Sequence, residues 1–598
     1  MKTYANPTFR YRRSADQRPG AAARHPVVVV GAGPVGLCTA IDLALNGQPV
    51  VLLDEDQTVS VGSRAVCYAK RSLEILDRLG CAQPIVERGV SWSRGRVFLR
   101  DREVYGFDLL PESGHRRPAF VNLQQYHLEE ALVARAAALP GVDLRWRNTV
   151  TKVVPREDRV ELSIETPDGV YRLEADWLVV ADGARSPVRH LLGLESKGQV
   201  FRDRFLIADV TMKADYPTER WFWFDPPFHP GQSVLLHRQA DNVWRVDFQL
   251  GWDADPEEEK KPERVLPRLR AMLGERDFEL EWVSVYTFQC RRMDAFRHGR
   301  TLFAGDAAHQ VSPFGARGAN SGIQDADALA WRLAAVVRGE AGEAVLDDWA
   351  QEREAAADEN ILNSTRSTDF ITPKSPVARA FRDATLELAA TLPFARRLVN
   401  SGRLSVPAVL DASPANSRCE DASGAFDAPA MRPGAPSVDA PLATVDGEPA
   451  WWLQRAGGCF ELLLFDDAGD TAATAERVAT LREACAGRGL PVPRVSVVLP
   501  AGSRHAVPLA ERLDACRLAD AAQVLLDREG LLARRCDARP GTAYLLRPDQ
   551  HVCARWRAPD GERMADAVAR AMHRAPAAGA ASSPGSARAG AAVAGASR

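Results

Sequence analysis

Three glycines and one carboxylate near the start of the chain form a pattern that can bind a pyrophosphate. The stretch PVVVVGAGPVGLCTAIDLALNGQPVVLLDED runs from an apolar strand into Gly31, Gly33 and Gly36 at GxGxxG spacing, and a second strand ends at Asp54. Gly31 permits a tight turn, Gly33 lets a pyrophosphate approach the backbone, and Gly36 lets helix and strand pack closely. Asp54 can accept hydrogen bonds from an adenosine ribose. The stretch predicts a dinucleotide site, and the alternative is a tight turn without a ligand.

A second stretch, residues 301–333 (TLFAGDAAHQVSPFGARGANSGIQDADALAWRL), places a carboxylate at the end of an apolar strand, before a glycine-rich loop and a helix. Asp306 can bind the ribitol hydroxyls of an extended flavin dinucleotide. The helix expected to begin near Gly318 can aim backbone N–H groups and its positive dipole end at the pyrimidine edge of a flavin. We therefore expect Gly315, Gly318 and Gly322 to admit a flat ring, and we predict FAD rather than NAD as the bound cofactor.

A third motif lies between these two. DWLVVADGARSPVRHLLG reads as a strand that ends at Asp182 and Gly183, followed by Ser186 and Arg189. With the three motifs in this order, residues 26 to 380 resemble the class A flavoprotein aromatic hydroxylases, the superfamily of p-hydroxybenzoate and phenol hydroxylases.

The resemblance implies a set of FAD contacts. Arg64 in SVGSRAVCYAK and Gln125 in NLQQYHLEEAL fall where relatives place flavin-contacting residues. Without the resemblance they read as a surface charge and a helix-start amide. The residues expected to contact FAD are Gly31, Gly33, Pro34, Gly36, Asp54, Arg64, Gln125, Asp182, Gly183, Arg189, Gly305, Asp306, Pro313, Gly318, Ala319 and Asn320.

Candidates for catalysis are fewer. Pro313 matches the proline that borders the reactive edge of the flavin in relatives, and Arg317 stands where p-hydroxybenzoate hydroxylase has a lysine, so its role stays open. In residues 216–250, His237 and Tyr216 are candidates for phenol or carboxylate contacts. His229 and Arg238 are further candidates for the same contacts. The alternative for each is a place in the sheet core. His309 also reads as a loop-packing imidazole.

The reaction that the resemblance implies is aromatic hydroxylation. NADH or NADPH reduces FAD, O₂ forms a flavin C4a-hydroperoxide, and a phenolic ring is hydroxylated ortho or para to its hydroxyl, in aromatic catabolism. Compounds like 3-(3-hydroxyphenyl)propionate are the first expectation. The alternatives are an epoxidase or other non-phenolic monooxygenase, or an FAD-binding protein without hydroxylase activity. A halogenase is disfavoured because WFWF at 221–224 is not followed by Ile-Pro.

These residues need an α/β fold to position them, because each motif joins a strand end to a helix. We expect a Rossmann-like FAD-binding domain of glutathione-reductase type over 25–400 (about 25–90, 120–200 and 296–400), with an interleaved β-rich substrate domain (about 91–119 and 201–295). Residues 401–435 read as a linker, and 1–24 and 574–598 as disordered tails. Residues 436–573 resemble the thioredoxin-like domain of phenol and hydroxyphenylpropionate hydroxylases, especially YLLRPDQHVCARW, but without CxxC.

Composition limits the partners. The 598 residues carry 76 basic and 79 acidic side chains, a net charge of -3, so no basic surface for nucleic acid is expected. No apolar run reaches the roughly 20 residues that a membrane span needs. Ten scattered cysteines without CxxC or zinc spacing indicate a reducing cytoplasm and no metal site. The expected partner is a small phenol, and relatives suggest a homodimer.

Overall fold

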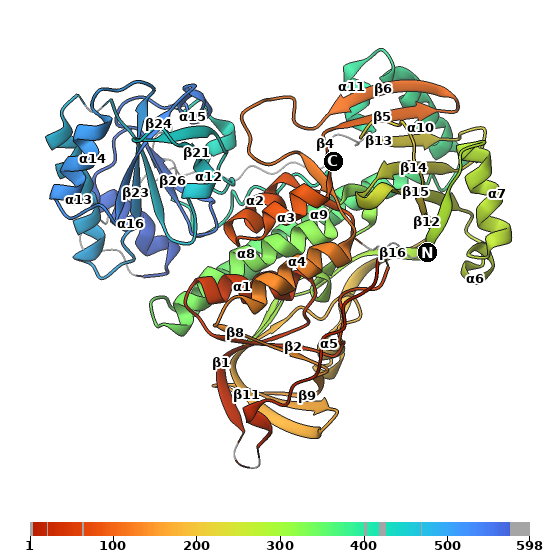
Figure 1. Ribbon diagram of the computed structural model, residues 1–598, viewed down its shortest axis with the longest axis horizontal. Helices are drawn as coiled ribbons and strands as arrows, with labels where there is room; N and C mark the ends of the chain where they lie inside the picture. Colours follow the sequence, from red (N-terminus) through yellow and green to blue (C-terminus); the bar gives the residue numbers. More distant parts are fainter. Residues whose placement is uncertain are drawn as a thin grey trace, which may run out of the picture.

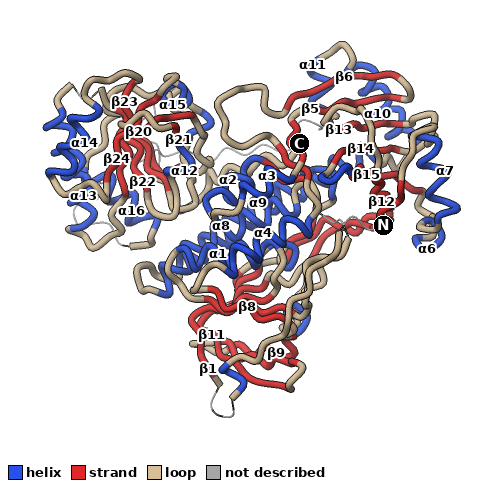
Figure 2. The backbone as a smooth tube through the Cα atoms, in the orientation of Figure 1, coloured by secondary structure: helices blue, strands red, loops and turns tan. Residues whose placement is uncertain are grey.

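The computed structural model describes residues 4–18, 20, 22–62, 65–399, 404–417, 426–467 and 469–574. Three large β-sheets surround a central layer of helices (Figures 1 and 2). We call them sheet I, below the helices in Figure 1, sheet II at the upper right, and sheet III at the left. The predicted α/β class, with a Rossmann-like FAD domain, a β-rich substrate part and a thioredoxin-like C-terminal part, is confirmed.

Sheet I has a parallel core because its strands are apolar runs buried on both faces. Helices α1 (Pro34–Leu45), α4 (Gln125–Ala137) and α8 (Gly318–Val337) lie above it in Figure 1, and α1 packs on both α4 and α8. Its parallel strands, in spatial order, are β18 (Thr301–Phe303), β11 (Gly169–Val180), β1 (Ala23–Val30), β2 (Val50–Asp54) and β8 (Val142–Trp146). Antiparallel strands complete it: β17 (Arg297–His298), β9 (Thr149–Pro155) and β10 (Val160–Thr166).

Smaller elements connect sheet I to the rest of the molecule. A three-stranded sheet stands in the order β3 (Cys67–Ala69), β7 (Phe120–Asn122) and β4 (Val90–Trp92). The short helices of this part of the chain are α2 (Lys70–Arg78), α3 (Ala82–Arg88), α5 (Pro187–Leu191) and the 3₁₀ turns η1 (Ala15–Gln17), η2 (Ala240–Asn242), η3 (Gly305–Ala307) and η4 (Pro313–Gly315).

Sheet II alternates apolar positions, so that its two faces pack on different partners. One face packs against α7 (Pro262–Leu273), and the other, which we call the inner face, packs with Phe314 of η4 and Ile371 of α9. Its strands, in spatial order, are β19 (His309–Gln310), β16 (Glu279–Met293), β12 (Ser196–Thr211), β15 (Val243–Leu250), β14 (Ser233–Arg238), β13 (Arg220–Phe224), β5 (Arg94–Leu99) and β6 (Arg102–Asp108). The adjoining helices are α6 (Pro256–Glu259), α9 (Ala344–Ile371), α10 (Pro376–Ala389) and α11 (Pro393–Leu398).

Sheet III forms the C-terminal part of the chain. Strands β22, β23 and β24 run parallel, β25 pairs antiparallel with β22, and β26 pairs antiparallel with β25. In spatial order its strands are β21 (Pro449–Trp451), β20 (Pro441–Thr444), β24 (Ala522–Asp527), β23 (Arg494–Pro500), β22 (Glu461–Phe465), β25 (Ala543–Leu546) and β26 (Val552–Trp556). The helices are α12 (Trp452–Arg455), α13 (Thr471–Ala486), α14 (Ala506–Ala515), α15 (Leu531–Arg535) and α16 (Gly561–Ala571), with the 3₁₀ turn η6 (Pro429–Met431) before them.

The turn between β25 and β26 docks sheet III onto the helices of the FAD-binding part. Arg547 donates to Glu352 on α9 at 2.6 Å and to Asp549 at 2.9 Å. Arg71 on α2 donates to the Gln550 side chain at 2.8 Å and to the Asp549 carbonyl at 2.7 Å. All five side chains are buried. The RPDQH motif is therefore an inter-domain contact made of charged groups.

The prediction of a disordered tail over 1–24 is wrong for residues 4–18. Tyr4 stacks on Tyr126 with ring centroids 4.1 Å apart, and Phe9 stacks on Trp146 at 4.5 Å. Asp16 accepts from Arg145 at 2.6 Å. A few aromatic side chains among arginines hold this segment, which the average composition of the stretch did not reveal.

Other segments also differ from the expectation. The stretch expected to be a linker, 401–435, packs against its neighbours where it is described, with Leu410, Ala415 and Met431 buried. Of the tail predicted over 574–598, only Arg574 belongs to the described residues. Among the helices of the described ranges, none combines the length and the apolar character that crossing a membrane requires.

Candidate cofactor and substrate site

The glycines of the first motif differ in what surrounds them. Gly31 has a φ of 102°, and a Cβ added there would lie 2.4 Å from the Ala181 carbonyl oxygen. A Cβ added at Gly36 would lie 1.8 Å from the Gly31 carbonyl oxygen, so helix α1 and the turn touch at this point. At Gly33 nothing lies within 4 Å of an added Cβ. The first and third glycines thus close the turn, and the second leaves open space for a pyrophosphate, beside Pro34, the first residue of α1.

Asp54 stands at the carboxyl end of β2, beside the glycine turn. Its Oδ2 accepts from the Ala32 N–H at 2.5 Å, and its Oδ1 accepts from the Asp56 N–H at 2.8 Å. Burial raises the pKa of Asp54 to about 6, and the two N–H donors oppose that rise. A further donor, such as a ribose hydroxyl, would stabilise the charged carboxylate in the same way.

The carboxylate of Asp325, which was not among the predicted site residues, supports the loop at Gly305 and Asp306. Asp325, in the middle of α8, accepts from the Gly305 N–H at 2.9 Å and from Arg353 Nε at 2.6 Å, and it lies 2.6 Å from His309 Nε2. Although burial opposes it, these partners lower the pKa of Asp325, His309 contributing most among them. His309 is thus the loop-packing imidazole that one interpretation suggested. Nothing in the helical pattern of α8 distinguished Asp325 from a surface acid.

The motif at Asp182 is tied to the same loop. Asp182 ends the strand, and its Oδ2 accepts from the Val188 N–H at 3.0 Å. The Arg189 guanidinium donates to the Ala307 carbonyl at 2.7 Å and to the Ala184 carbonyl at 3.0 Å. Arg189, for which an FAD contact is predicted, joins the two loops that carry Asp182 and Asp306.

The side chains of Asn320 and Gln125 also form hydrogen bonds with backbone groups. On the first turn of α8, near Gly318 and Ala319, the Asn320 side chain donates to the Cys67 carbonyl at 2.8 Å and accepts from the Ala69 N–H at 2.8 Å. Gln125 accepts from the Ala65 N–H at 3.0 Å. Both side chains fix the segment around β3 against the cofactor loop. Arg64, in that segment, lies outside the described residues.

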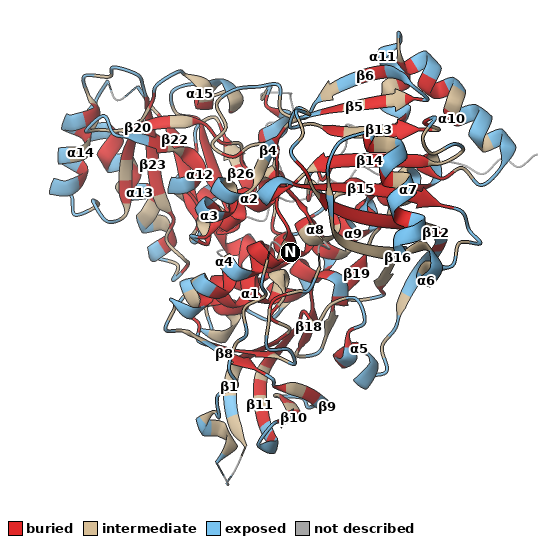
Figure 3. Ribbon diagram, turned by 45° about the vertical axis from the view of Figure 1, so that its right-hand side comes forward, coloured by how far each residue is buried: buried red, intermediate tan, exposed pale blue. Residues whose placement is uncertain are grey.

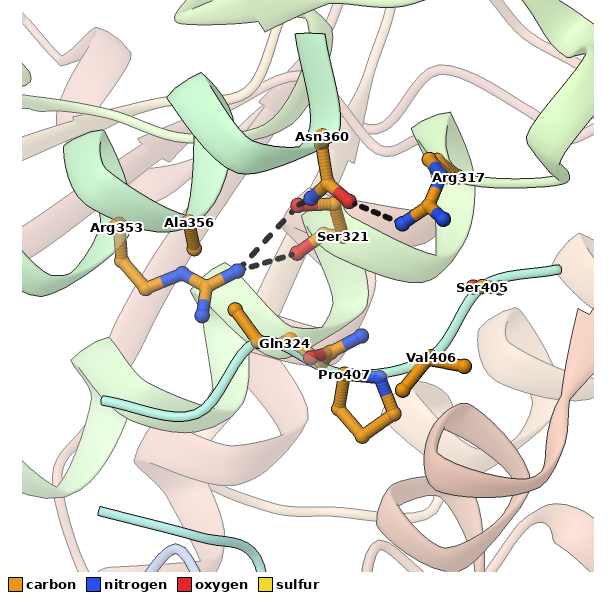
Figure 4. A pocket seen from close by; sticks show the side chains of 10 residues that line it. Arg317, Ser321, Gln324, Arg353, Ala356, Asn360, Ser405, Val406 and Pro407 are labelled. Atoms are coloured by element: carbon orange, nitrogen blue, oxygen red, sulfur yellow. Dashed lines mark hydrogen bonds between the residues drawn. The ribbon is translucent and has the colours of Figure 1, made fainter. Parts of the chain in front are cut away.

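The Arg317 side chain binds the neighbouring helix α9. It is buried, and its Nη1 donates to Asn360 on α9 at 2.8 Å, beside Ser321 and Arg353 (Figure 4). These polar groups lie where α8 and α9 meet residues 405–408. The catalytic role predicted for Arg317 is not what this contact provides, because the side chain joins α8 to α9.

Two of the loop glycines have protein neighbours that explain them. A Cβ added at Gly315 would lie 2.7 Å from Arg317 Nε, and one added at Gly322 would lie 2.6 Å from Val35 Cγ2. Only Gly318 is left with room, since its added Cβ would have nothing closer than 3.8 Å. The expectation that a flat ring accounts for all three glycines therefore stays open only for Gly318.

The inner face of sheet II meets the cofactor loop. Pro313 is exposed, and the next residue, Phe314, packs edge-on against Phe205 at 4.7 Å and Phe288 at 5.3 Å. Cys67, whose carbonyl accepts from Asn320, has its Sγ 3.7 Å from His237 Nδ1. The loop that begins α8 and the inner face of sheet II thus enclose one region.

His237 and Tyr216 lie on opposite sides of sheet II. His237 is buried on the inner face, and burial, together with Arg220 and Arg245, holds the pKa of its imidazole well below the usual range. Tyr216 packs with Trp221 and Trp244 in the cluster on the other face. Tyr216 thus lies away from the inner face, and its catalytic role stays a prediction that these contacts do not support. The two further candidates make other contacts. His229 Nε2 forms a hydrogen bond with the Gln249 carbonyl, and the Arg238 guanidinium lies over the Trp244 ring.

A row of polar residues on the inner face was missed from the sequence. The register pairs His237 with Arg245, and Arg245 with Asp209, and it places Arg220 opposite His237. Asp247 lies next along β15 on the same face, and burial raises its pKa to about 6. The sequence does carry a signal for this row. In RWFWF and VWRVDFQL every second residue faces the outer side of the sheet, and the polar residues of the row occupy the positions in between.

The arrangement fits FAD. It supplies open backbone at Gly33 for a pyrophosphate, a carboxylate at the end of β2 for a ribose, an exposed carboxylate at Asp306 for ribitol, and the start of α8 for a flavin ring. For each individual residue, the predicted contact with FAD remains a prediction. Residues whose side chains hydrogen-bond backbone groups act by positioning the loops.

Comparisons with known proteins agree with this arrangement. Residues 24–364 match the family described as FAD binding domain. The chain is 36% identical over 384 residues to 6-methylpretetramide 4-monooxygenase of Streptomyces rimosus, covering 62% of this chain and 67% of that protein. It is 31% identical over 390 residues to 3-(3-hydroxy-phenyl)propionate/3-hydroxycinnamic acid hydroxylase of Mycolicibacterium smegmatis, covering 64% and 67%.

Solved structures extend the likeness to the whole fold. The flavin-dependent monooxygenase PieE, in complex with FAD and substrate, superposes with a TM-score of 0.75 at 21% identity, covering 92% of this chain and 99% of that one. The p-nitrophenol 4-monooxygenase PnpA of Pseudomonas putida gives 0.56 at 29% identity, covering 64% and 99%. The cofactor is FAD, and NADH or NADPH and O₂ are the co-substrates. The chain therefore belongs to the FAD binding domain family, as a class A FAD-dependent aromatic monooxygenase.

Proposed function

We propose that this protein hydroxylates a phenolic ring held between the start of α8 and the inner face of sheet II. The observation that carries the proposal is the set of buried polar groups on that face, Arg220, His237 and Asp247, next to the loop of Pro313. Bound FAD supplies the electrons and the activated oxygen, using NADH or NADPH and O₂. The protein binds and orients the ring.

His237 is the group proposed to accept a hydrogen bond from the phenol hydroxyl. Its low pKa keeps the imidazole neutral at pH 7, and its Nε2 is buried and has no hydrogen-bond partner within the described residues. A neutral imidazole nitrogen can accept a hydrogen bond from a phenol hydroxyl that lies within reach, and this bond would orient the ring.

Apolar side chains beside this group keep water out. Phe205, Phe288, Phe314 and Leu235 pack in one cluster on the inner face. A dry surrounding strengthens the polar contacts to the substrate and protects a reactive oxygen species from water.

The test is oxidation of NADH and NADPH by the purified yellow protein across a panel of phenols and phenolic acids, with peroxide measured in parallel. We expect at least one phenol to accelerate oxidation while peroxide stays low, because hydroxylation consumes the activated oxygen. If no phenol accelerates oxidation, or if all electrons end as peroxide, the proposed function is wrong.

We further propose that the protein forms a homodimer through α10 and α11. This region is exposed in Figure 3 and carries six exposed large apolar side chains: Val377, Phe381, Leu388, Leu392, Phe394 and Leu398. Such a cluster favours a protein interface. Light scattering on a size-exclusion column is expected to give a dimer for the native chain and a monomer for Phe381→Asp/Phe394→Asp. Val507→Asp, an exposed apolar site on α14, is the control. A native monomer would refute the proposal.

A cytoplasmic location is proposed as well. All nine cysteines within the described residues are unpaired. Free thiols of this number suit a reducing compartment.

A further inference from the structure

We propose that Arg547, in the turn between β25 and β26, is a positioning residue for FAD. It acts through helix α9 on the loop that carries Gly305 and Asp306. This role lies outside the proposed function, because it concerns how the C-terminal part holds the cofactor site and does not depend on the substrate. The docked C-terminal part thereby gains a task in cofactor binding.

Arg547 spreads its guanidinium over two carboxylates. Its Nη1 donates to Glu352 on α9 at 2.6 Å, and its Nε and Nη2 donate to Asp549 at 3.0 Å and 2.9 Å. The planar fork of arginine allows this double contact, whereas the ammonium of lysine is a single point charge. All three side chains are buried, so the loss of a partner is costly and α9 is held firmly against the turn.

Arg353, the next residue of α9, contacts a different helix. Its Nε donates to Asp325 on α8 at 2.6 Å, and its Nη2 donates to Ser321 Oγ, in the first turn of α8, at 3.3 Å. Successive side chains of an α-helix point about 100° apart, so one short stretch of α9 contacts both the docking turn and α8. Because the two residues share one rigid segment of a closely packed helix, a displacement of Glu352 also displaces Arg353.

Asp325 connects α9 to the cofactor loop. Its Oδ1 accepts from Arg353, and its Oδ2 accepts from the Gly305 N–H at 2.9 Å. The next residue in the loop, Asp306, is the carboxylate predicted to bind the ribitol. A shift of Asp325 would therefore move the backbone that presents Asp306 to the cofactor.

A second connection runs from the same turn to α8. Arg71 on α2, which bonds the Gln550 side chain, also donates to Asp327 at 3.0 Å. Asp327 lies two residues beyond Asp325 on α8. The turn is thus linked to the middle of α8 through α9 and through α2, and its docking bears on the part of α8 that supports the cofactor loop.

The experiment is a double-mutant cycle in the holoenzyme, built from Arg547→Lys and Arg353→Lys. Both variants keep the positive charge, so no buried carboxylate loses its counterion. The rate of FAD release is followed by the rise in flavin fluorescence after dilution. We expect each single variant to release FAD about 3- to 30-fold faster than the native protein, the range for residues that act on a site through other residues.

The double variant shows whether the two arginines act along one connection. If Arg547 acts through Arg353, the double variant releases FAD at most about 2-fold faster than the faster single variant. If the two effects multiply, Arg547 does not act through α9 and the inference is overturned. It is also overturned if Arg547→Lys releases FAD at the native rate.

A matched control separates positioning from a general loss of stability. Leu525→Ala removes a buried side chain of β24 in the C-terminal part, and it is expected to lower the melting temperature at least as much as Arg547→Lys does. The control should leave FAD release and the visible circular dichroism of the bound flavin unchanged, whereas Arg547→Lys should change both. If Leu525→Ala speeds FAD release to the same extent, Arg547 only stabilises the C-terminal part and the inference fails.

Discussion

Replacement of Glu352 by alanine is expected to lower the free energy of unfolding by about 3–5 kcal/mol, the cost of breaking a buried ion pair by removing one partner. Glu352 is fully buried and accepts from Arg332 at 2.9 Å, from Arg547 at 2.6 Å and from Ser413 Oγ at 2.5 Å. Without its carboxylate, two arginines remain buried beside each other. Burial would raise the pKa of Glu352, but these two arginines bring it down to about 2.

The pH dependence of this contribution has a definite sign. The folded-state pKa of Glu352 lies below its ordinary value of 4.5, so its stabilisation is present above pH 4.5 and is lost as pH falls toward 2. The native protein should therefore lose stability over this interval more steeply than the variant does.

Urea unfolding followed by circular dichroism measures the effect. Glu359→Ala is the control, because Glu359 is exposed on the same helix and forms no ion pair with an arginine of the described residues. Glu352→Gln is expected to fall between the two, since it keeps the shape and loses the charge. If Glu352→Ala and Glu359→Ala unfold at the same urea concentration, the network does not stabilise the fold.

A second large effect is expected for alanine substitutions at Gly36 and Gly33. The first should impair the fold, and the second should impair FAD binding alone. An alanine at Gly36 brings its Cβ into the Gly31 carbonyl, so helix α1 must move away from β1. We expect Gly36→Ala to be destabilised by about 1–3 kcal/mol and to be purified without FAD. An alanine at Gly33 meets no protein atom within 4 Å, so the fold should stay intact. It occupies the space proposed for the pyrophosphate, and FAD affinity should fall about 100-fold.

The ratio of flavin to protein absorbance and the melting temperature of the apoprotein distinguish the two failures. Gly342→Ala is the control, because it also has open space around an added Cβ and lies away from the motif. Retention of FAD by Gly33→Ala would show that the pyrophosphate lies elsewhere.

Short sequence patterns predicted those parts of the site that are built from residues close together in the chain. The strand, turn and helix around Gly31 and Gly36 follow from apolar runs and glycine spacing within some thirty residues, and the structure gives both glycines the close neighbours that the motif requires. The carboxylates Asp54, Asp182 and Asp306 each stand at a strand end for the same reason.

Features that depend on several distant segments were not predictable from spacing. The row of Arg220, His237 and Arg245 exists only because three strands pair in one register, and the sequence alone does not fix that register. For the same reason the sequence did not show that Tyr216 lies on the face opposite His237. Asp325 and Arg353 were missed because their helices give no sign of the loop that they support. The contact of Arg317 was not predictable because its partner Asn360 lies on another helix.

The docking of the RPDQH turn also sets an order in which the protein can form during synthesis. Arg71 and Gln550, which bond each other, are 479 residues apart, and Glu352 meets Arg547 across 195 residues. A ribosome therefore releases Arg71, Arg332 and Glu352 long before their C-terminal partners exist. The nascent FAD-binding part carries charged groups that still lack their C-terminal partners, on surfaces that are later buried, and its final stability waits for nearly the last strand to be translated.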